Sequence, residues 1–322
     1  MIDVTLLGTA ATMPLPDRAL TSVFLSCGGH SILFDCGEGT QTAARKAHVS
    51  LMKTDLIALT HYHGDHIFGL PGLLQTMACL GRTQPLYLTG PDGLDEAMRP
   101  IIQLSGALPF PVLAFAPMNL QDSPERDNYT FHFSDYIAGW PEEASLTVFR
   151  TEHRVPSCGY SFCLARPGRF DPERALALQI PQRLWGVLQH GDCVELADGR
   201  TIAPEEVLGP ERKGLKVVFS GDTAPCGGLK NAAESADLLL CDATYGEDSQ
   251  QGQADKYGHS TFSRTAALAR DAGVKRLWLV HFSQIMERPE DYLYYASEFF
   301  PEAVCGTDGM RIRLSFEQDR RE

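Results

Sequence analysis

Residues 56–66 of the chain read LIALTHYHGDH. The apolar run that opens this segment predicts a short buried β-strand, and the polar residues after it predict a turn at the strand's end. Within six residues the turn carries three imidazoles and a carboxylate, at His61, His63, Asp65 and His66. Neutral imidazoles and carboxylates are ligands that suit zinc, and also manganese or iron. The segment therefore predicts a metal site at the end of a strand.

The spacing within the turn predicts two metal ions. His61 and His63 stand two residues apart and can point at one ion. Gly64 permits a tight bend that can direct Asp65 and His66 toward a second ion. A lone histidine is usually an ordinary surface or core residue, but that explanation does not fit four potential ligands in one turn directly after a strand.

Two ions need more ligands than one turn supplies, and further candidates lie where later apolar runs end. Each follows a strand-like run directly: His153, Asp222 and His281. A polar residue at a strand end is weak evidence when taken alone. Because the ends of successive strands lie along one edge of a sheet, we expect the three residues to join the turn at residues 61–66.

The distribution of apolar runs predicts an α/β fold with two similar halves. Strands are expected at residues 4–7, 22–25, 31–35, 55–60, 86–89, 215–219, 236–241 and 276–280, and helices at residues 39–48, 71–80 and 263–272. Strands in both halves end in His or Asp, which suggests two mixed sheets packed face to face with helices outside. We therefore expect residues 1–322 to form a single αββα sandwich domain.

Residues 166–213 depart from this regular pattern. They are rich in proline, glycine and charges of both signs, which predicts a protruding arm or insertion, or a long surface excursion between strands. Arginines are interleaved with acidic residues there, at Arg166, Arg169, Asp171, Glu173, Arg174 and Arg183. A phosphate-binding face and an ordinary solvated face explain this mixture about equally well.

The composition restricts the class of protein further. The formal net charge is −13 and the pI is about 5.2, the opposite of the balance in proteins that bind nucleic acid through a broad basic surface. A metal pair can nevertheless supply positive potential locally. The N-terminus lacks the basic and apolar regions of a secretory signal, and no stretch approaches the ~20 apolar residues of a membrane span. We therefore expect a cytoplasmic protein that does not enter a membrane.

The sequence resembles the ribonuclease Z family, the tRNA 3′-processing endonucleases of the metallo-β-lactamase superfamily. The turn at residues 61–66 is typical of the superfamily. The stretches FDCGEGTQ at residues 34–41 and IFGLPG at residues 67–72 narrow the likeness to ribonuclease Z-like members. Further matching stretches at residues 7–11, 219–223, 258–261 and 280–281 extend it over almost the whole chain.

The resemblance implies a role for every candidate ligand. It assigns His61, His63 and His153 to the first metal, Asp65, His66 and His281 to the second, and Asp222 to both. It also implies two Zn²⁺ per chain, with Mn²⁺ or Fe²⁺ as substitutes. Asp35, at a neighbouring strand end, would support the ligand turn from behind.

Two catalytic residues follow from the same resemblance. Asp65 would orient the attacking water and accept its proton. His259 would stabilise the transition state or protonate the leaving 3′-oxygen, although the stretch at 258–261 is also typical of a plain helix-capping loop. The chain departs from the family at Cys241-Asp242, where relatives carry His-Glu. Because aspartate is one methylene shorter, we expect Asp242 to reach His259 through a water or after a shift of the loop.

The sequence predicts the generic chemistry better than the substrate. The favoured function is an endonuclease that removes the 3′ trailer of precursor tRNA by metal-activated hydroxide attack, and the resemblance implies a homodimer. The alternative is a small-molecule phosphodiesterase or an arylsulfatase-like hydrolase of the same superfamily, which the acidic net charge favours. A non-enzymatic binding module is the weakest possibility, because all seven ligand positions hold competent residues.

Overall fold

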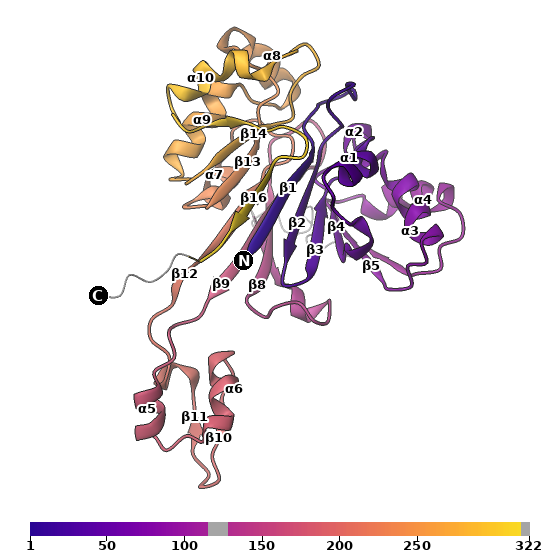
Figure 1. Cartoon of the computed structure of the whole chain (residues 1–322). Coiled ribbons are helices and arrows are strands. Elements are labelled where there is room, and N and C mark those ends of the chain that lie inside the picture. The colour runs from indigo at the N-terminus through magenta and orange to yellow at the C-terminus, as the bar shows by residue number, and fades with distance from the viewer. Residues whose placement is uncertain (115–127, 317–322) are drawn as a thin grey trace.

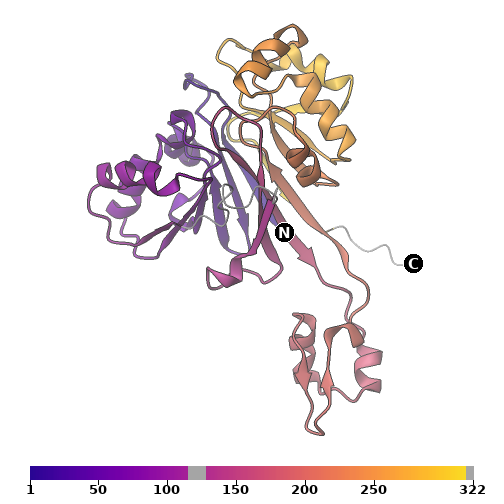
Figure 2. The same ribbon diagram turned by 180° about the vertical axis from the view of Figure 1, so that it is seen from behind.

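Two β-sheets packed face to face form the centre of the molecule, and helices cover both outer faces (Figures 1 and 2). The structure is a computed structural model and describes residues 1–114 and 128–316. The four layers confirm the expected αββα sandwich. Within the described ranges, no helix has the length and apolar character needed to cross a membrane.

The first sheet is built from the N-terminal half and one strand from the C-terminal end. Its order is β16-β1-β2-β3-β4-β5-β6. These strands span β1 (Ile2–Gly8), β2 (Ser22–Cys27), β3 (His30–Phe34), β4 (Leu56–Ala58), β5 (Leu86–Thr89), β6 (Val112–Ala114) and β16 (Arg311–Leu314). Strands β3 to β6 run parallel, whereas β16, β1, β2 and β3 alternate in direction. The longer helices of this half are α1 (Thr40–Lys46), α3 (Leu70–Cys79) and α4 (Leu94–Leu104).

The second sheet repeats this mixed arrangement in the order β15-β14-β13-β12-β9-β8-β7. Its strands span β7 (Asn128–His132), β8 (Ala144–Arg150), β9 (Cys158–Arg166), β12 (Arg212–Phe219), β13 (Leu238–Asp242), β14 (Leu277–Val280) and β15 (Val304–Cys305). Strands β12 to β15 run parallel, and β7, β8, β9 and β12 alternate. The helices of this half are α7 (Gly227–Ala233), α8 (Gln251–Tyr257), α9 (Phe262–Asp271) and α10 (Leu293–Ser297).

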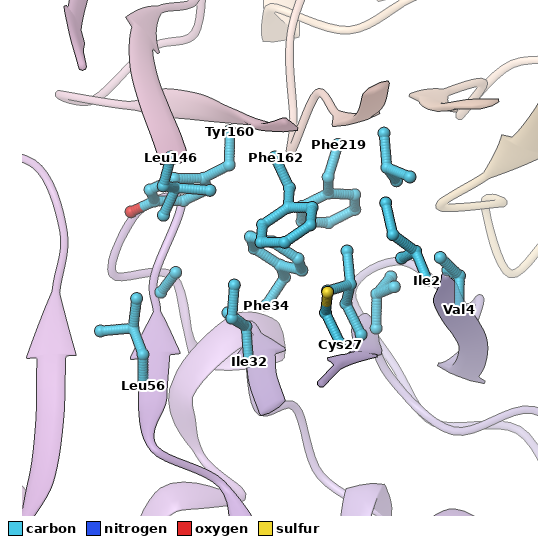
Figure 3. Close-up of a cluster of buried hydrophobic side chains, with 14 of the residues drawn as sticks. Ile2, Val4, Cys27, Ile32, Phe34, Leu56, Leu146, Tyr160, Phe162 and Phe219 are labelled. Atoms are coloured by element: carbon cyan, nitrogen blue, oxygen red, sulfur yellow. The ribbon is translucent and has the colours of Figure 1, made fainter. Parts of the chain in front are cut away.

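Aromatic and aliphatic side chains from both sheets fill the space between them (Figure 3). The ring of Phe34 lies 5.6 Å from that of Tyr160 and 5.8 Å from that of Phe219, so residues of β3, β9 and β12 meet directly. Burying each large apolar side chain contributes roughly 1.5–3 kcal/mol. This core fixes one sheet against the other and thereby brings strand ends from both halves to the same place.

Each strand and helix expected from the sequence is present, most of them with ends shifted by a few residues. The expected strand at residues 55–60 forms regular sheet only over β4, because a side-chain hydrogen bond replaces the ladder after it. The amide of Leu59 still donates to the Thr89 carbonyl, but the amide of Thr60 donates to the Asp35 carboxylate at 2.8 Å. The sheet ladder therefore gives way to a side-chain contact where the ligand turn begins.

A small unit between β9 and β12 projects from the body of the molecule (bottom of Figure 1). It contains α5 (Pro172–Ala177), α6 (Trp185–Gln189) and the antiparallel pair β10 (Val194–Glu195) and β11 (Thr201–Ile202). Its buried apolar residues are Ala175, Ile180, Leu188, Val194, Leu196, Ile202 and Val207. The unit therefore has a small core of its own and is joined to the sandwich by two strands.

Candidate metal centre

The seven candidate ligands of the sequence come together at one edge of the sandwich. Directly after β4, the chain turns through His61 and His63 into α2 (Gly64–Ile67), a single helical turn that carries Asp65 and His66. His153, Asp222 and His281 follow β8, β12 and β14 within three residues of each strand's end. Residues from distant parts of the chain thus meet because both sheets present these strand ends to the same side.

Three imidazoles form the first group. His61 Nε2 lies 2.9 Å from His63 Nδ1, and His63 Nδ1 lies 3.4 Å from His153 Nε2. The carboxylate of Asp222 closes this group, because its Oδ2 lies 3.7 Å from His61 Nε2. Three converging nitrogens and one carboxylate oxygen match the ligand number and type of a tetrahedral zinc site.

The second group lies on the other side of Asp222. Asp222 Oδ1 lies 3.3 Å from His66 Nε2 and 3.2 Å from His281 Nε2. Asp65 Oδ2 lies 3.7 Å from His66 Nε2 and 3.6 Å from His281 Nε2. Since the two oxygens of Asp222 face different groups, this carboxylate has the geometry of a bridge between two ions.

The polar atoms of this cluster fit a cation better than they fit one another. His66 Nε2, Asp222 Oδ1 and His281 Nε2 are buried and have no hydrogen-bond partner. An unsatisfied buried polar atom costs roughly 1–3 kcal/mol, so three together need an explanation. All three point into the second group. A divalent ion bound there would satisfy all three and offset the negative charge of Asp65 and Asp222.

Asp35 supports the ligand turn from behind, as expected from its strand end. Its Oδ2 lies 2.7 Å from Nδ1 of His66 and accepts a 2.8 Å hydrogen bond from the Thr60 hydroxyl. That hydroxyl in turn lies 3.1 Å from Nδ1 of His61. The fully buried carboxylate therefore orients one imidazole from each group, with Nε2 left free for a metal.

The remaining strand-end histidines are oriented in the same manner by other partners. His153 Nδ1 lies 2.9 Å from the carbonyl oxygen of Gly258 and donates to it, which leaves Nε2 unprotonated. His281 Nδ1 lies 2.8 Å from the Thr244 hydroxyl. Such contacts fix the tautomer and the ring plane of a metal-binding histidine.

Burial and neighbouring charges set the protonation of the cluster. Burial lowers the pKa of His61 well below its ordinary value and also lowers the pKa values of His63 and His153, which favours the neutral form that binds metal. Burial alone would raise the pKa of the Asp65 carboxyl, but the imidazoles of His281 and His66 outweigh that effect and lower it. These three imidazoles and Asp65 are thus in the state that binds metal. His66 differs, because the carboxylates of Asp222 and Asp35 outweigh burial and raise its pKa well above the ordinary value, so it must lose a proton when an ion binds.

His259 lies at the rim of the cluster, directly against two of its histidines. Its ring centroid is 5.0 Å from that of His153 and 5.3 Å from that of His281. Burial opposes a charge on this ring, but the carboxylate of Asp242 more than compensates and raises the pKa of His259 to about 9. The imidazole is therefore protonated at neutral pH and can donate a proton.

The expectation that a water lies between Asp242 and His259 is wrong, whereas the expected shift of the loop stays a prediction. Asp242 Oδ2 lies 2.7 Å from His259 Nδ1 in a direct ion pair. The shorter side chain suffices because Asp242 is the last residue of β13, and the stretch before α9 carries His259 directly over this strand end. The same carboxylate also accepts hydrogen bonds from the amides of Thr223 and Thr244.

The sequence did not predict two contacts of the site. The backbone amide of Thr12 donates to Asp65 Oδ2 at 2.8 Å, and a backbone donor leaves no signal in a residue pattern. The hydroxyl of Thr244 connects His281 to Asp242. Its position two residues after Asp242, beyond the same strand, was the signal that could have identified it.

Comparison with known proteins agrees with this geometry. The family model described as a beta-lactamase superfamily domain matches residues 198–282, and the model described as anti-Pycsar protein Apyc1 matches residues 2–102. The ribonuclease Z of Agathobacter rectalis is 41% identical over 99% of this chain and 100% of that protein. The ribonuclease Z of Clostridium tetani is 38% identical over 98% of this chain and 100% of its own length.

A solved structure of the same family is also similar to this chain. The short form of human tRNase Z superposes with a TM-score of 0.67 at 29% identity, over 98% of this chain and 100% of that one. The similarity to these relatives covers nearly the whole length of both partners. The chain therefore belongs to the ribonuclease Z family of metallo-β-lactamase-fold hydrolases.

Proposed function

We propose that this protein is a two-metal endoribonuclease that removes the 3′ trailer of precursor tRNA. One observation carries the proposal: the two oxygens of Asp222 face two separate groups of converging ligands, in a chain related over its full length to ribonuclease Z. Because the chain belongs to a family of hydrolytic enzymes, the alternative of a non-enzymatic binding module is wrong.

Each ion would have its own ligands in this arrangement. His61, His63 and His153 would hold the first ion, Asp65, His66 and His281 the second, and Asp222 both. We propose Zn²⁺ in both positions because imidazoles and carboxylates in near-tetrahedral sets suit it, with Mn²⁺ or Fe²⁺ as substitutes. Bound there, such a pair supplies a hydroxide near neutral pH and offsets the charge that develops on the phosphate.

Asp65 has the position required to orient the nucleophile. Its Oδ2 accepts a hydrogen bond from the Thr12 amide and faces the second group. The side chain of Asp65 is 13% exposed, whereas that of His66 is fully buried. A carboxylate fixed at the open side of the cluster can accept a hydrogen bond from an attacking water and take its proton.

His259 has the position and charge required to assist the leaving group. It lies beside both ligand groups and has Asp242 behind it, so its free Nε2 can donate a proton to the departing 3′-oxygen. General acid assistance of this kind typically contributes about 10²–10⁴-fold to the rate. Asp242 is a positioning residue in this scheme, because it acts through His259.

The projecting unit is proposed to be a substrate-binding arm of a single-domain enzyme. Strand β12 begins at this unit and ends next to Asp222, and its eight residues at about 3.3 Å each span about 26 Å. A molecule that contacts both must be long, which suits a folded RNA better than a small phosphodiester. The homodimer implied by the family resemblance is part of the same proposal, and the mass of the protein in solution tests it.

One observation favours the second candidate, a small-molecule phosphodiesterase. Residues 167–211 contain four arginines and eight carboxylates, a net charge of −4, so the arm as a whole repels a phosphate backbone. An arm that binds RNA must therefore use single arginines on one face rather than a broad basic surface.

Cleavage of a precursor tRNA with a 3′ trailer separates the two candidates. We expect a single endonucleolytic cut by the full-length enzyme and a loss of at least about 100-fold in kcat/KM when residues 167–211 are replaced by a short Gly-Ser linker. Bis(p-nitrophenyl) phosphate serves as the control substrate, since it is too small to reach the arm. Hydrolysis of this ester without any cut in the RNA would favour the small-molecule enzyme.

A further inference from the structure

Arg154 is an exposed arginine directly beside the metal centre. It follows His153 in sequence, and its guanidinium carbon lies 4.8 Å from the centroid of the Tyr257 ring. The ammonium of Lys256 lies 5.3 Å from the same ring. Two cations therefore share one aromatic ring at the C-terminal end of α8.

The chain holds Arg154 and Tyr257 together through the residues next to them. The carbonyl of Gly258 receives the Nδ1 hydrogen bond of His153, which draws the two segments into contact. They are so close that a side-chain carbon at position 258 would lie 2.8 Å from the Cα of His153, and Gly258 has a φ of +70°. Only glycine fits there without strain. The arginine and the tyrosine are consequently fixed relative to the cluster by its own backbone.

Arg154 differs from several other arginines of this acidic chain, because no carboxylate of the described residues neutralises it. Among residues 1–114 and 128–316, its guanidinium forms no ion pair, and the Tyr257 ring is its partner. By contrast, Arg174, Arg200, Arg264, Arg270 and Arg313 each pair with an aspartate. A planar guanidinium stacked on a ring keeps its donors available for a bidentate contact with phosphate.

The surroundings of Arg154 combine positive charge with aromatic surface. The half-buried ring of Tyr245 lies 6.3 Å from that of His259. Burial raises the pKa of Tyr245, whereas the charge of Arg154 acts in the opposite direction, so this tyrosine is also within electrostatic range of the guanidinium. Aromatic faces that can stack on bases, next to cations that can contact phosphates, are the usual elements of a single-stranded nucleic-acid site.

We propose that Arg154, stacked on Tyr257, binds the backbone phosphate next to the scissile one and so positions single-stranded RNA across the metal centre. The proposal rests on the proposed endonuclease function. Helix α8 lies at the end of the molecule opposite the projecting unit (Figure 1), so that unit cannot supply this contact from the same chain. A local cation is needed to fix the register of the strand, and this one lies beside His153 and His259.

The test compares Arg154→Ala with Arg270→Ala on a precursor tRNA over a range of KCl concentrations. Arg270 is the matched control because its guanidinium also lies over a ring, 5.5 Å from the centroid of Phe299, but at the far end of α9. We expect Arg154→Ala to raise KM roughly tenfold with a much smaller change in kcat, and Arg154→Lys to restore part of the loss.

The salt dependence separates a phosphate contact from a structural effect. Losing one phosphate contact lowers the slope of log KM against log salt by about 0.7–0.9, a change that mere loosening of the fold does not produce. The loss of kcat/KM on the RNA should also exceed the loss on bis(p-nitrophenyl) phosphate, which has no neighbouring phosphate, by at least about fivefold.

Equal KM values and equal salt slopes for Arg154→Ala, Arg270→Ala and the unmodified enzyme would overturn the proposal while leaving the endonuclease function intact. Failure of the unmodified enzyme to cut the RNA at all, with bis(p-nitrophenyl) phosphate still hydrolysed, would overturn the proposed function and this inference with it.

Discussion

Replacing Asp242 with asparagine tests how the site keeps His259 protonated. Asp242 is fully buried and contacts His259 Nδ1 at 2.7 Å, the Thr223 amide at 3.1 Å and the Thr244 amide at 2.9 Å. Asparagine has nearly the same shape and retains one oxygen that can accept from Thr244. The substitution therefore removes the negative charge while changing the packing little.

The size of the effect follows from the pKa of His259. Burial disfavours the imidazolium, yet the charge of Asp242 raises this pKa to about 9, from an ordinary value of 6.5. At 1.36 kcal/mol per pH unit, the difference is about 3 kcal/mol of stabilisation of the charged ring. Without the carboxylate only burial remains, so the pKa should fall to 6.5 or lower. At pH 7.5 the protonated fraction would then drop from nearly all to about one tenth.

The assay is the pH dependence of kcat on precursor tRNA between pH 5.5 and 9.5. A group that must be protonated supports activity below its pKa and loses it as the pH rises through that value. We therefore expect the alkaline limb of Asp242→Asn to lie at least about two pH units below that of the unmodified enzyme, with kcat at pH 7.5 lowered tenfold or more. Bound metal ions shift the alkaline limbs of both enzymes to lower pH, so the difference in pH between the two limbs is the quantity to compare.

Asp237→Asn is the matched control for this experiment. Asp237 is a buried carboxylate immediately before β13, the strand that Asp242 ends, and it pairs with Lys275 at 3.1 Å. Its substitution should lower stability without moving the pH profile. If the alkaline limbs of Asp242→Asn and the unmodified enzyme coincide, His259 is not the proton donor that Asp242 supports.

Three further outcomes are expected. Asp65→Ala should reduce kcat on any phosphodiester by at least about 10³-fold with an unchanged circular dichroism spectrum, and retention within tenfold of the original rate would contradict its role. Asp35→Ala should lower the free energy of unfolding in urea by about 3–5 kcal/mol and weaken metal affinity about 10–100-fold, measured by competition with a chromogenic chelator, because a buried partner of His66 is lost. Removal of metal with dipicolinate should abolish activity and lower Tm, with both restored at two zinc ions per chain by mass spectrometry; one ion per chain would contradict the bridging role of Asp222.

The sequence predicted which candidate ligands would come together, because their chemistry and their topology coincide. An apolar run that ends in His or Asp gives both the strand and the side chain that the strand delivers, as at His153, Asp222 and His281. Parallel strands present these ends on one edge, so separation in the chain does not imply separation in space. The expected fold class followed from the same pattern in both halves.

The contacts that orient the ligands could not be predicted from the sequence. Whether Asp242 touches His259 depends on distances of about one ångström between a strand end and a helix start, and side-chain length alone did not predict the direct contact. Arg154 resembles any other exposed arginine in the sequence, and its ring partner lies 103 residues away, at Tyr257. Such features depend on packing between segments rather than on local pattern.

Backbone conformation shows where the fold favours function over local stability. Asp35 follows β3 with a φ of 54°, and His281 follows β14 with a φ of 62°. A non-glycine residue in this left-handed region costs roughly 1 kcal/mol or more, and glycine would be the easier choice at both positions. Glycine, however, would remove the carboxylate that orients His66 or the imidazole that completes the second group. One strand end in each sheet thus passes through a left-handed residue whose side chain serves the cluster, because Asp35 contacts His66 and His281 faces Asp222.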